Sequence, residues 1–448
     1  METRQTEILI IGAGYAGIGA ATQLYTAGKD FLVVEARDRI GGRVWSKTLP
    51  NNTTIDLGAQ WIGPDQKLMW EQALKHQVKT FDTYDEGKNI LYYNNKTTYY
   101  KGTIPKIDPF SLISLGLSLD KINKWCKKIP LDKPWEALDA KRLDAITVQN
   151  WMDQHIRFPK ARFLFKVGVE TVFACPPSEI SMLQALFYAH SGTDFEKLIS
   201  IQNGAQQTRF EKGSQHLLQC MAQSFQDKIL LDNPVKAIEQ SETSVKVFTE
   251  KIIIHANKVI ITVPPALIEK ISFLQPLPAN RVQLQQRVPM GSAMKSFAVY
   301  KKPFWREKGF SGQVVSDLNP VQVTFDCSPE DASCGIILSF IEAENERFMI
   351  TLLEEKRKEM VLQRLSQYFG KEALEPDYYL DKSWAEEEWS GGCYAGNPTP
   401  GTLTSFGEYL RKPCGNIHWA GTETAMKGNG YMEGALESGY RAAKEVLY

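Results

Sequence analysis

The N-terminal segment alternates between apolar runs and glycine turns. An apolar run from Ile8 to Ile11 ends at Gly12, small residues then follow a helical pattern to Gly28, and a second apolar run ends at Glu35. A short apolar run bounded by turn residues is typical of a buried strand, and the spacing between the two runs is helical. The pattern predicts a strand, a glycine turn, a helix and a second strand.

The pattern changes in the middle of the chain. Residues 80–210 are aromatic, lysine-rich and helical in spacing, which predicts a largely helical insertion that caps the ligand site. Residues 233–266 alternate between apolar and polar positions and predict three short strands followed by a buried fourth, Val259 to Val263, which a proline pair closes.

The last third of the chain returns to strands and ends in a helix. The runs SFAVYKKPFW, VQVTFD and GIILSFI predict strands, and ENERFMITLLEEKRKEMVLQRLSQYFG predicts one charged helix. A short strand at 417–420 precedes a helix that opens at Met432, with small and apolar residues at 432, 435, 436, 439, 443 and 446. Such a helix directs its N-terminus, with its positive potential, toward a ligand.

These elements predict an α/β protein with two interleaved domains, because 448 residues exceed one ordinary core and no flexible linker is visible. A Rossmann-like domain takes residues 1–79, 211–286 and 387–448, and a mixed α+β domain takes residues 80–210 and 287–386.

Charge and composition exclude several classes of protein. The 52 basic residues balance the 52 acidic ones, which argues against nucleic acid or an anionic membrane as the main partner. No apolar run reaches the roughly 20 residues of a spanning helix, and the N-terminus has no secretory signal. The seven cysteines are scattered and include no CxxC pair, which argues against disulfides and a metal site. We therefore expect a soluble, cytoplasmic protein.

The glycine turn carries the first chemical signal. Gly12, Gly14 and Gly17 have the GxGxxG spacing, in which the first makes the turn, the second admits a pyrophosphate and the third packs helix against strand. Glu35 lies 18 residues beyond Gly17, where an acid accepts hydrogen bonds from an adenosine ribose. The segment predicts a dinucleotide site.

The continuation EARDRIGGR resembles the glycine doublet and arginine of flavin-dependent oxidases of the amine oxidase class, whose loop runs beside the FAD pyrophosphate. The motif IDLGAQWIG resembles the loop of the same family that reaches the isoalloxazine ring, with Gly58 and Ala59 leaving room for it. The resemblance implies FAD and a two-domain flavoprotein fold of the amine oxidase and glutathione reductase type. The cofactor-binding residues that we expect are Gly12, Gly14, Gly17, Glu35, Arg37, Gly42, Arg43, Gly58, Ala59, Gln60, Trp61, Val235, Trp384, Cys393, Gly421, Thr422, Glu423, Tyr431 and Met432.

The motif SGGCY at 390–394 makes the resemblance more specific, because the chain looks like a flavin-containing monoamine oxidase over nearly its whole length. In the mitochondrial members the cysteine of this motif is joined through a thioether to the 8α-methyl group of FAD. The resemblance therefore implies a covalent flavin at Cys393, with the flanking glycines allowing close contact with the ring. Membrane-bound members continue into a hydrophobic anchor, whereas this chain stops at Tyr448, so we expect no membrane anchor.

The same resemblance implies the catalytic residues. Tyr394 and Tyr431, in GYMEGA, match the paired tyrosines that form the parallel walls of an aromatic cage over the flavin, and Lys295 matches a lysine that contacts flavin N5 through a water. The substrate-binding residues that we expect are Thr171, Val172, Phe173, Ile199, Gln206, Val323, Tyr394 and Tyr431. The implied reaction converts a primary or secondary monoamine to an imine, which hydrolyses to an aldehyde, while O2 is reduced to H2O2.

Three alternatives stay open. A diamine or polyamine oxidase needs a carboxylate for the distal ammonium, and Glu342 and Glu344 are candidates that the sequence does not place in the cavity. An L-amino-acid oxidase needs an arginine for the substrate carboxylate, and none stands out. A flavin-binding interaction protein without turnover would carry a long coiled insertion, which this chain lacks. The partners that we expect are a small amine and O2, and the sequence leaves a homodimer open.

Overall fold

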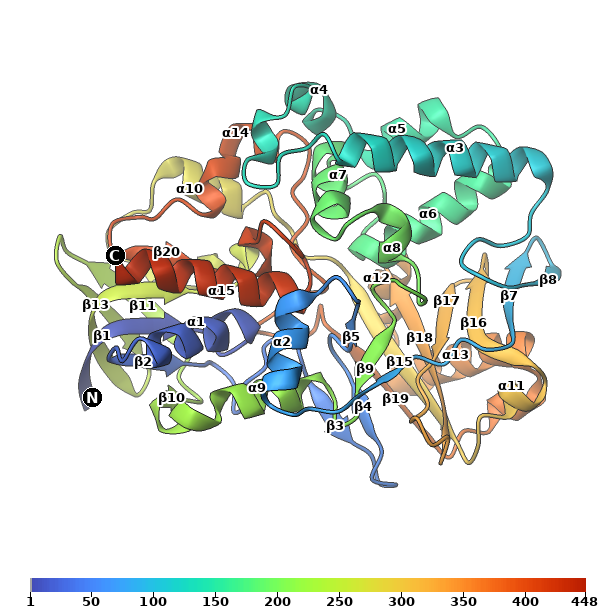
Figure 1. Ribbon diagram of the computed structural model, residues 1–448, viewed down its shortest axis with the longest axis horizontal. Coiled ribbons are helices and arrows are strands. Elements are labelled where there is room, and N and C mark those ends of the chain that lie inside the picture. Colours follow the sequence, from blue (N-terminus) through green and yellow to red (C-terminus); the bar gives the residue numbers. More distant parts are fainter. Residues whose placement is uncertain (1) are drawn as a thin grey trace.

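A computed structural model describes residues 2–448 and shows two main sheets side by side, with helices around both (Figure 1). The larger sheet has the strand order β10-β2-β1-β13-β12-β11-β14, and β20 also pairs with β13. Its strands are β1 (Glu2–Ile11), β2 (Phe31–Val34), β10 (Ile229–Leu230), β11 (Val235–Gln240), β12 (Val245–Thr249), β13 (Ile252–Ile261), β14 (Ser272–Phe273) and β20 (Ile417–Trp419). Its centre is parallel, since β1 runs parallel to β2 and β13.

Alternate residues of β1 pack against different layers. Ile8 and Ile10 pack against the helical layer formed by α1 (Tyr15–Thr26), α2 (Lys67–Lys75), α9 (Ser214–Ala222) and α15 (Met432–Leu447). Leu9 and Ile11 belong to a second apolar cluster with residues of β11, β12 and β13. Burial on both faces explains why the sequence of this strand is a continuous apolar run.

The smaller sheet has the strand order β19-β15-β18-β17-β16-β7-β8. These strands are β7 (Lys88–Tyr93), β8 (Lys96–Tyr100), β15 (Ala293–Tyr300), β16 (Phe310–Ser316), β17 (Val323–Asp326), β18 (Gly335–Glu342) and β19 (Tyr378–Ser383). Short strands form two further sheets, β3 (Ser46–Thr48) with β4 (Thr54–Asp56), and β5 (Trp61–Ile62), β9 (Thr208–Phe210) and β6 (Thr80–Asp82). The strands of the two main sheets fall within the two predicted sets of segments, and the domain division itself stays a prediction.

Most of the remaining helices form a group beside the smaller sheet (Figure 1). This group comprises α3 (Pro109–Cys126), α4 (Ala140–Asp144), α5 (Val148–His155), α6 (Pro159–Phe173), α7 (Met182–Ser191) and α8 (Phe195–Leu198). Other helices are α10 (Ala279–Gln285), α11 (Phe304–Glu307), α12 (Glu344–Met349), α13 (Glu354–Phe369) and α14 (Thr402–Phe406). Within residues 2–448, none of the helices combines the length and the apolar character that crossing a bilayer requires.

The structure corrects three sequence predictions. The insertion at 80–210 begins with strands, because β7 and β8 form a hairpin whose turn residues Asn94 and Asn95 both have positive φ angles, of 51° and 56°. The predicted third and fourth strands of 233–266 are one strand, β13. The predicted charged helix is two helices, α12 and α13.

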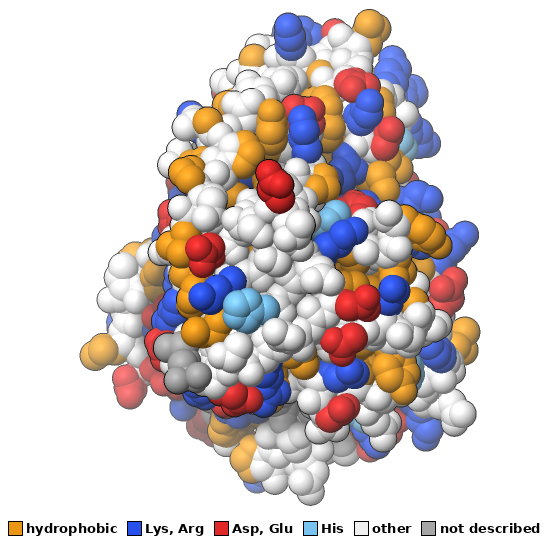
Figure 2. All heavy atoms as spheres, turned by 90° about the vertical axis from the view of Figure 1, so that its left-hand side faces the viewer, with side chains coloured by type: hydrophobic (Ala, Val, Ile, Leu, Met, Phe, Trp, Pro, Cys, Tyr) orange, Lys and Arg blue, Asp and Glu red, His pale blue; other side chains and the backbone are white. Residues whose placement is uncertain are grey.

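Charged groups of both signs are mixed on the surface. On the face of the molecule beside the two chain ends, basic and acidic side chains alternate over short distances (Figure 2). This distribution agrees with the equal numbers of basic and acidic residues in the sequence.

Candidate active site

A cavity opens where β1, β2 and β13 end. Its lining includes Ile11 at the end of β1, Gly12 after it, Glu35 after β2, and Thr262 after β13. The carboxyl ends of parallel strands are the usual place for a ligand in an open α/β sheet. The predicted site residues that line this cavity are Gly12, Gly14, Glu35, Arg37, Gly42, Arg43, Gly58, Ala59, Gln60, Trp61, Thr171, Val172, Gln206, Val235, Lys295, Trp384, Cys393, Tyr394, Gly421, Thr422, Tyr431 and Met432.

Five predicted residues do not line this cavity. Ile199 and Val323 line a second cavity, while Gly17, Glu423 and Phe173 line neither. Phe173 is the correction that matters most for the substrate site, because its ring packs edge-on against Tyr188 with centroids 4.9 Å apart. Tyr188 itself lines the cavity, so Phe173 supports the lining from behind.

The fold requires some glycines of the glycine turn but not all of them. A Cβ on Gly17 would lie 1.8 Å from the Gly12 carbonyl oxygen, so helix packing alone requires this glycine. Gly12 has a φ angle of 104°, which favours glycine. A Cβ on Gly14 would be 3.5 Å from its nearest protein atom, which is ordinary contact. The protein itself therefore does not require Gly14, which lines the cavity.

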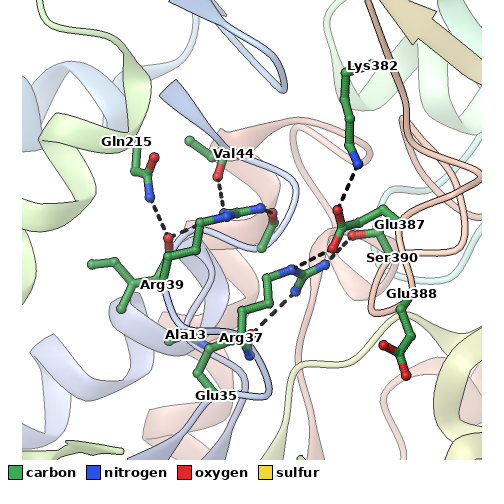
Figure 3. Close-up of polar contacts among 12 residues, drawn as sticks. Ala13, Glu35, Arg37, Arg39, Val44, Gln215, Lys382, Glu387, Glu388 and Ser390 are labelled. Atoms are coloured by element: carbon green, nitrogen blue, oxygen red, sulfur yellow. Dashed lines mark hydrogen bonds and ion pairs between the residues drawn. The ribbon is translucent and has the colours of Figure 1, made fainter. Parts of the chain in front are cut away.

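Polar contacts tie the acid after β2 to the loop that carries Cys393 (Figure 3). Glu35 accepts hydrogen bonds from the backbone N–H of Ala13 at 2.7 Å and of Arg37 at 3.1 Å. Arg37 donates in turn to Glu387 at 3.1 Å and to the Ser390 hydroxyl at 2.8 Å. Glu35 Oε1 also accepts from Arg37 Nη1 at 3.3 Å. Within residues 2–448, Oε2 accepts only the Ala13 bond and keeps further acceptor capacity, so a ribose contact to Glu35 stays a prediction.

Lys295 is buried on β15 and its ammonium group is fully engaged. It donates to the backbone oxygens of Asp56 at 2.9 Å and Gly58 at 2.7 Å and to Gln60 Oε1 at 2.6 Å. These three bonds use its three protons, so the predicted water contact requires one of them to open or the amine to be neutral. Burial lowers the pKa of Lys295 to about 8, which makes the neutral form accessible.

Cys393 is a free, buried thiol in the cavity wall. Burial raises its pKa to about 12, although Arg43 and Lys295 act in the opposite direction. Gly392, before it, has a φ angle of 146°, and a Cβ there would lie 2.4 Å from the Gly291 carbonyl oxygen. The neighbouring backbone therefore already requires a glycine at position 392, whether or not this residue also contacts the ring.

Tyr394 and Tyr431 line the same cavity, each with its own aromatic neighbour. The ring of Tyr394 lies 6.2 Å from that of Phe340, at 72°, and the ring of Tyr431 lies 5.7 Å from that of Tyr188, at 46°. Burial raises the pKa of both tyrosines, so both phenols are neutral at physiological pH. The parallel cage geometry stays a prediction.

Several lining residues were missed by the sequence reasoning. Phe325 and Phe340 line the cavity from the adjacent strands β17 and β18. The sequence pattern of these strands predicts a strand and carries no sign of a ligand. Tyr188 comes from α7, where it follows Phe187, and such a pair of buried aromatic residues is typical of a helix core. Glu342, which the sequence did not place, accepts a hydrogen bond from the Tyr394 hydroxyl at 2.5 Å.

A second cavity adjoins the first, because Thr171, Gln206 and Phe325 line both. Gln206 Oε1 is a buried polar atom without a hydrogen-bond partner in residues 2–448. Buried polar groups normally have partners, so a ligand or water at the junction would satisfy it. Asp85 and Glu86 also line this second cavity.

Four similarities to known proteins agree with a cofactor site of this kind. Residues 15–447 match the family described as flavin containing amine oxidoreductase. A probable flavin-containing monoamine oxidase A of Dictyostelium discoideum is 37% identical over 443 residues, which cover 98% of this chain and 97% of that protein. A solved structure of wild-type putrescine oxidase bound to putrescine has a TM-score of 0.96 and 31% identity over 99% of both chains. A cyclohexylamine oxidase from Brevibacterium oxydans has a TM-score of 0.94 and 30% identity over 98% of both chains.

Proposed function

The chain belongs to the flavin-containing amine oxidoreductase family, and from this premise we propose that it oxidises primary or secondary monoamines in the first cavity. The family match confirms the predicted resemblance, the α/β flavoprotein fold and an FAD-dependent amine oxidase. We propose the monoamine preference and the roles of the individual residues.

The residues fit FAD. Gly14 leaves space that no protein atom requires, Glu35 has acceptor capacity for a ribose, and Tyr431 and Met432 present the N-terminus of α15 to the cavity. FAD would accept two electrons from the amine and pass them to O2. We also propose that residues 1–79, 211–286 and 387–448 form its domain, and that Cys393 holds it covalently.

The cage would bind and orient the amine. The neutral, buried rings of Tyr394 and Tyr431 offer π faces that attract a cationic amine and orient a neutral one. Three oxygen acceptors hold the side-chain nitrogen of Lys295 at a fixed point of the cavity wall, where it would be positively charged or neutral. The apolar lining from Phe340 and Tyr188 would exclude water from the reacting α-carbon.

One observation carries this proposal. Cys393, Lys295, Tyr394 and Tyr431 come from three separate parts of the chain and line one cavity, together with the GxGxxG turn. The test compares H2O2 formation by the purified yellow protein on benzylamine, phenethylamine, putrescine and leucine. Turnover of the two aromatic monoamines in preference to putrescine and leucine is the expected result. Absence of peroxide with every amine would overturn the proposal.

A diamine oxidase is the second candidate, and the second cavity favours it. Asp85 and Glu86 line that cavity and supply the carboxylates that a distal ammonium needs. A putrescine oxidase is also among the structures similar to this chain. This candidate predicts that Asp85→Asn with Glu86→Gln raises KM for putrescine and leaves KM for benzylamine unchanged. Equal effects on both substrates would exclude it.

A further inference from the structure

The hydroxyl of Tyr394 has a dedicated acceptor. Its oxygen lies 2.5 Å from Glu342 Oε1, and Glu342 is 7% exposed. Glu342 is the last residue of β18, two positions beyond Phe340. Side chains two apart in a strand share a face, so the residue that packs against the Tyr394 ring and the residue that bonds its hydroxyl project together.

Packing alone does not explain a glutamate at position 342. A buried carboxyl group is costly unless it is paired or hydrogen-bonded, and Glu342 has no ion-pair partner within residues 2–448. Burial, together with the nearby Glu170, raises the pKa of Glu342 to about 8, although hydrogen bonding by the Tyr394 and Thr171 hydroxyls acts in the opposite direction. Glu170 is itself paired with Lys166 at 3.4 Å, and Lys295 lies on the adjacent strand β15, two residues from the Ala293 that pairs with Glu342.

Direct binding of a substrate ammonium does not fit this position. Glu342 lines neither cavity of the described chain, and its nearest polar contact is with the Tyr394 hydroxyl. The hydroxyl, in turn, is engaged with Glu342, so what Tyr394 offers the cavity is its ring.

We propose that Glu342 is a positioning residue for amine oxidation, which fixes the Tyr394 ring through its hydroxyl so that the amine meets the ring face. This inference rests on the proposed function, in which Tyr394 is one wall of the amine site. A ring fixed in advance loses no freedom when the amine binds, which raises the fraction of bound amine in a reactive orientation.

The test measures kcat and KM for benzylamine and the flavin content of the holoenzyme. The single variants are Glu342→Gln, Glu342→Asp, Glu342→Leu and Tyr394→Phe. The double variant combines Glu342→Leu with Tyr394→Phe. Glutamine keeps an acceptor at the same reach, so kcat/KM should stay within about threefold of the wild type, less than 0.7 kcal/mol by the usual conversion. Aspartate keeps the carboxyl group but shortens the reach, so it should lower kcat/KM about tenfold, as should leucine and Tyr394→Phe. The double variant should be no worse than either single variant, because both remove the same bond.

Two controls separate positioning from other effects. Glu346→Gln changes a buried carboxylate on α12 that bonds Ser383, and it should leave kcat/KM unchanged. A ranking in which aspartate exceeds glutamine would show that the carboxyl group matters more than its reach and would overturn the inference, as would additive losses in the double variant. If Glu342→Leu does not yield holoenzyme, the comparison of kcat/KM between Glu342→Asp and Glu342→Gln decides whether the inference holds. A wild-type protein that oxidises no amine would instead defeat the proposed function.

Discussion

Arg43 and Glu423 lie 380 positions apart in the sequence and form a buried, two-point ion pair, with Nη1–Oε1 at 2.6 Å and Nη2–Oε2 at 3.0 Å. Arg43 also donates to the backbone oxygen of Tyr394 at 2.8 Å, and Glu423 accepts from the N–H of Gly396 at 3.1 Å. Burial opposes ionisation of Glu423, but the charge and hydrogen bonds of Arg43 outweigh it and keep the pKa of Glu423 lowered. The pair joins the loop after β2, the Cys393 loop and the segment after β20 around one cavity.

Breaking this pair should destabilise the protein strongly. Glu423→Gln leaves the Arg43 charge buried without a counter-charge, and the loss should be about 3–5 kcal/mol in the free energy of unfolding. Urea unfolding monitored by tryptophan fluorescence measures it. Glu307→Gln is the control, because its pair with Lys302 is exposed and should contribute less than about 1 kcal/mol. Similar losses in the two variants would contradict the prediction.

The proposed covalent flavin can be tested by acid precipitation. Wild-type protein should carry its yellow colour into the pellet, and Cys393→Ala should release it into the supernatant while remaining folded. The thiol is already buried in the cavity wall, so alanine removes the sulfur with little change of packing. Cys175→Ala is the matched control, since this thiol is also buried but lines neither cavity, and its pellet should stay yellow. Release of the colour from wild-type protein would remove the covalent proposal and leave the oxidase proposal standing.

Two glycines of the same turn should respond differently to alanine. Gly14→Ala meets no protein clash, so it should lower stability by less than about 1 kcal/mol and weaken FAD binding at least about tenfold. Gly17→Ala places a Cβ against the Gly12 oxygen and should cost about 1–3 kcal/mol or more. Thermal unfolding and FAD titration, both in the Cys393→Ala background, measure these effects. Unchanged FAD affinity in Gly14→Ala would argue against a phosphate beside this turn.

The buried Lys295 should make stability depend on alkaline pH. Its folded pKa, about 8, lies below the unfolded value, so the native state binds this proton more weakly. The cost of the buried charge is therefore fully present below pH 8 and is relieved as the pH rises toward 10.5. Relative to Lys295→Met, wild-type protein should gain on the order of 3 kcal/mol of unfolding free energy across that window.

Urea unfolding at pH 7 and pH 10 measures this difference. The exposed Lys101→Met is the matched control and should leave the pH dependence of wild-type protein unchanged. Identical slopes for wild type and Lys295→Met would show that the lysine keeps its ordinary proton affinity in the folded state.

Short-range patterns predicted the elements that depend on nearby residues. The strand, turn and helix around Gly12 follow from a contiguous apolar run and from glycine spacing, and α15 begins at Met432 as its pattern indicates. The pattern of β13 wrongly predicted two strands. The first half of β13 pairs with the antiparallel β12, and its second half lies between β1 and β20. A change of neighbours altered the apolar pattern without ending the strand.

By itself, the sequence determined that this chain carries a dinucleotide turn and the motifs of a flavin amine oxidase, since those signals are local runs of residues. Only the tertiary structure decided that Arg43 meets Glu423, that Phe173 lies behind Tyr188, and that Glu342 bonds Tyr394. Such contacts depend on how distant strands pair and on which face each side chain projects, and neither is encoded in the spacing of neighbouring residues.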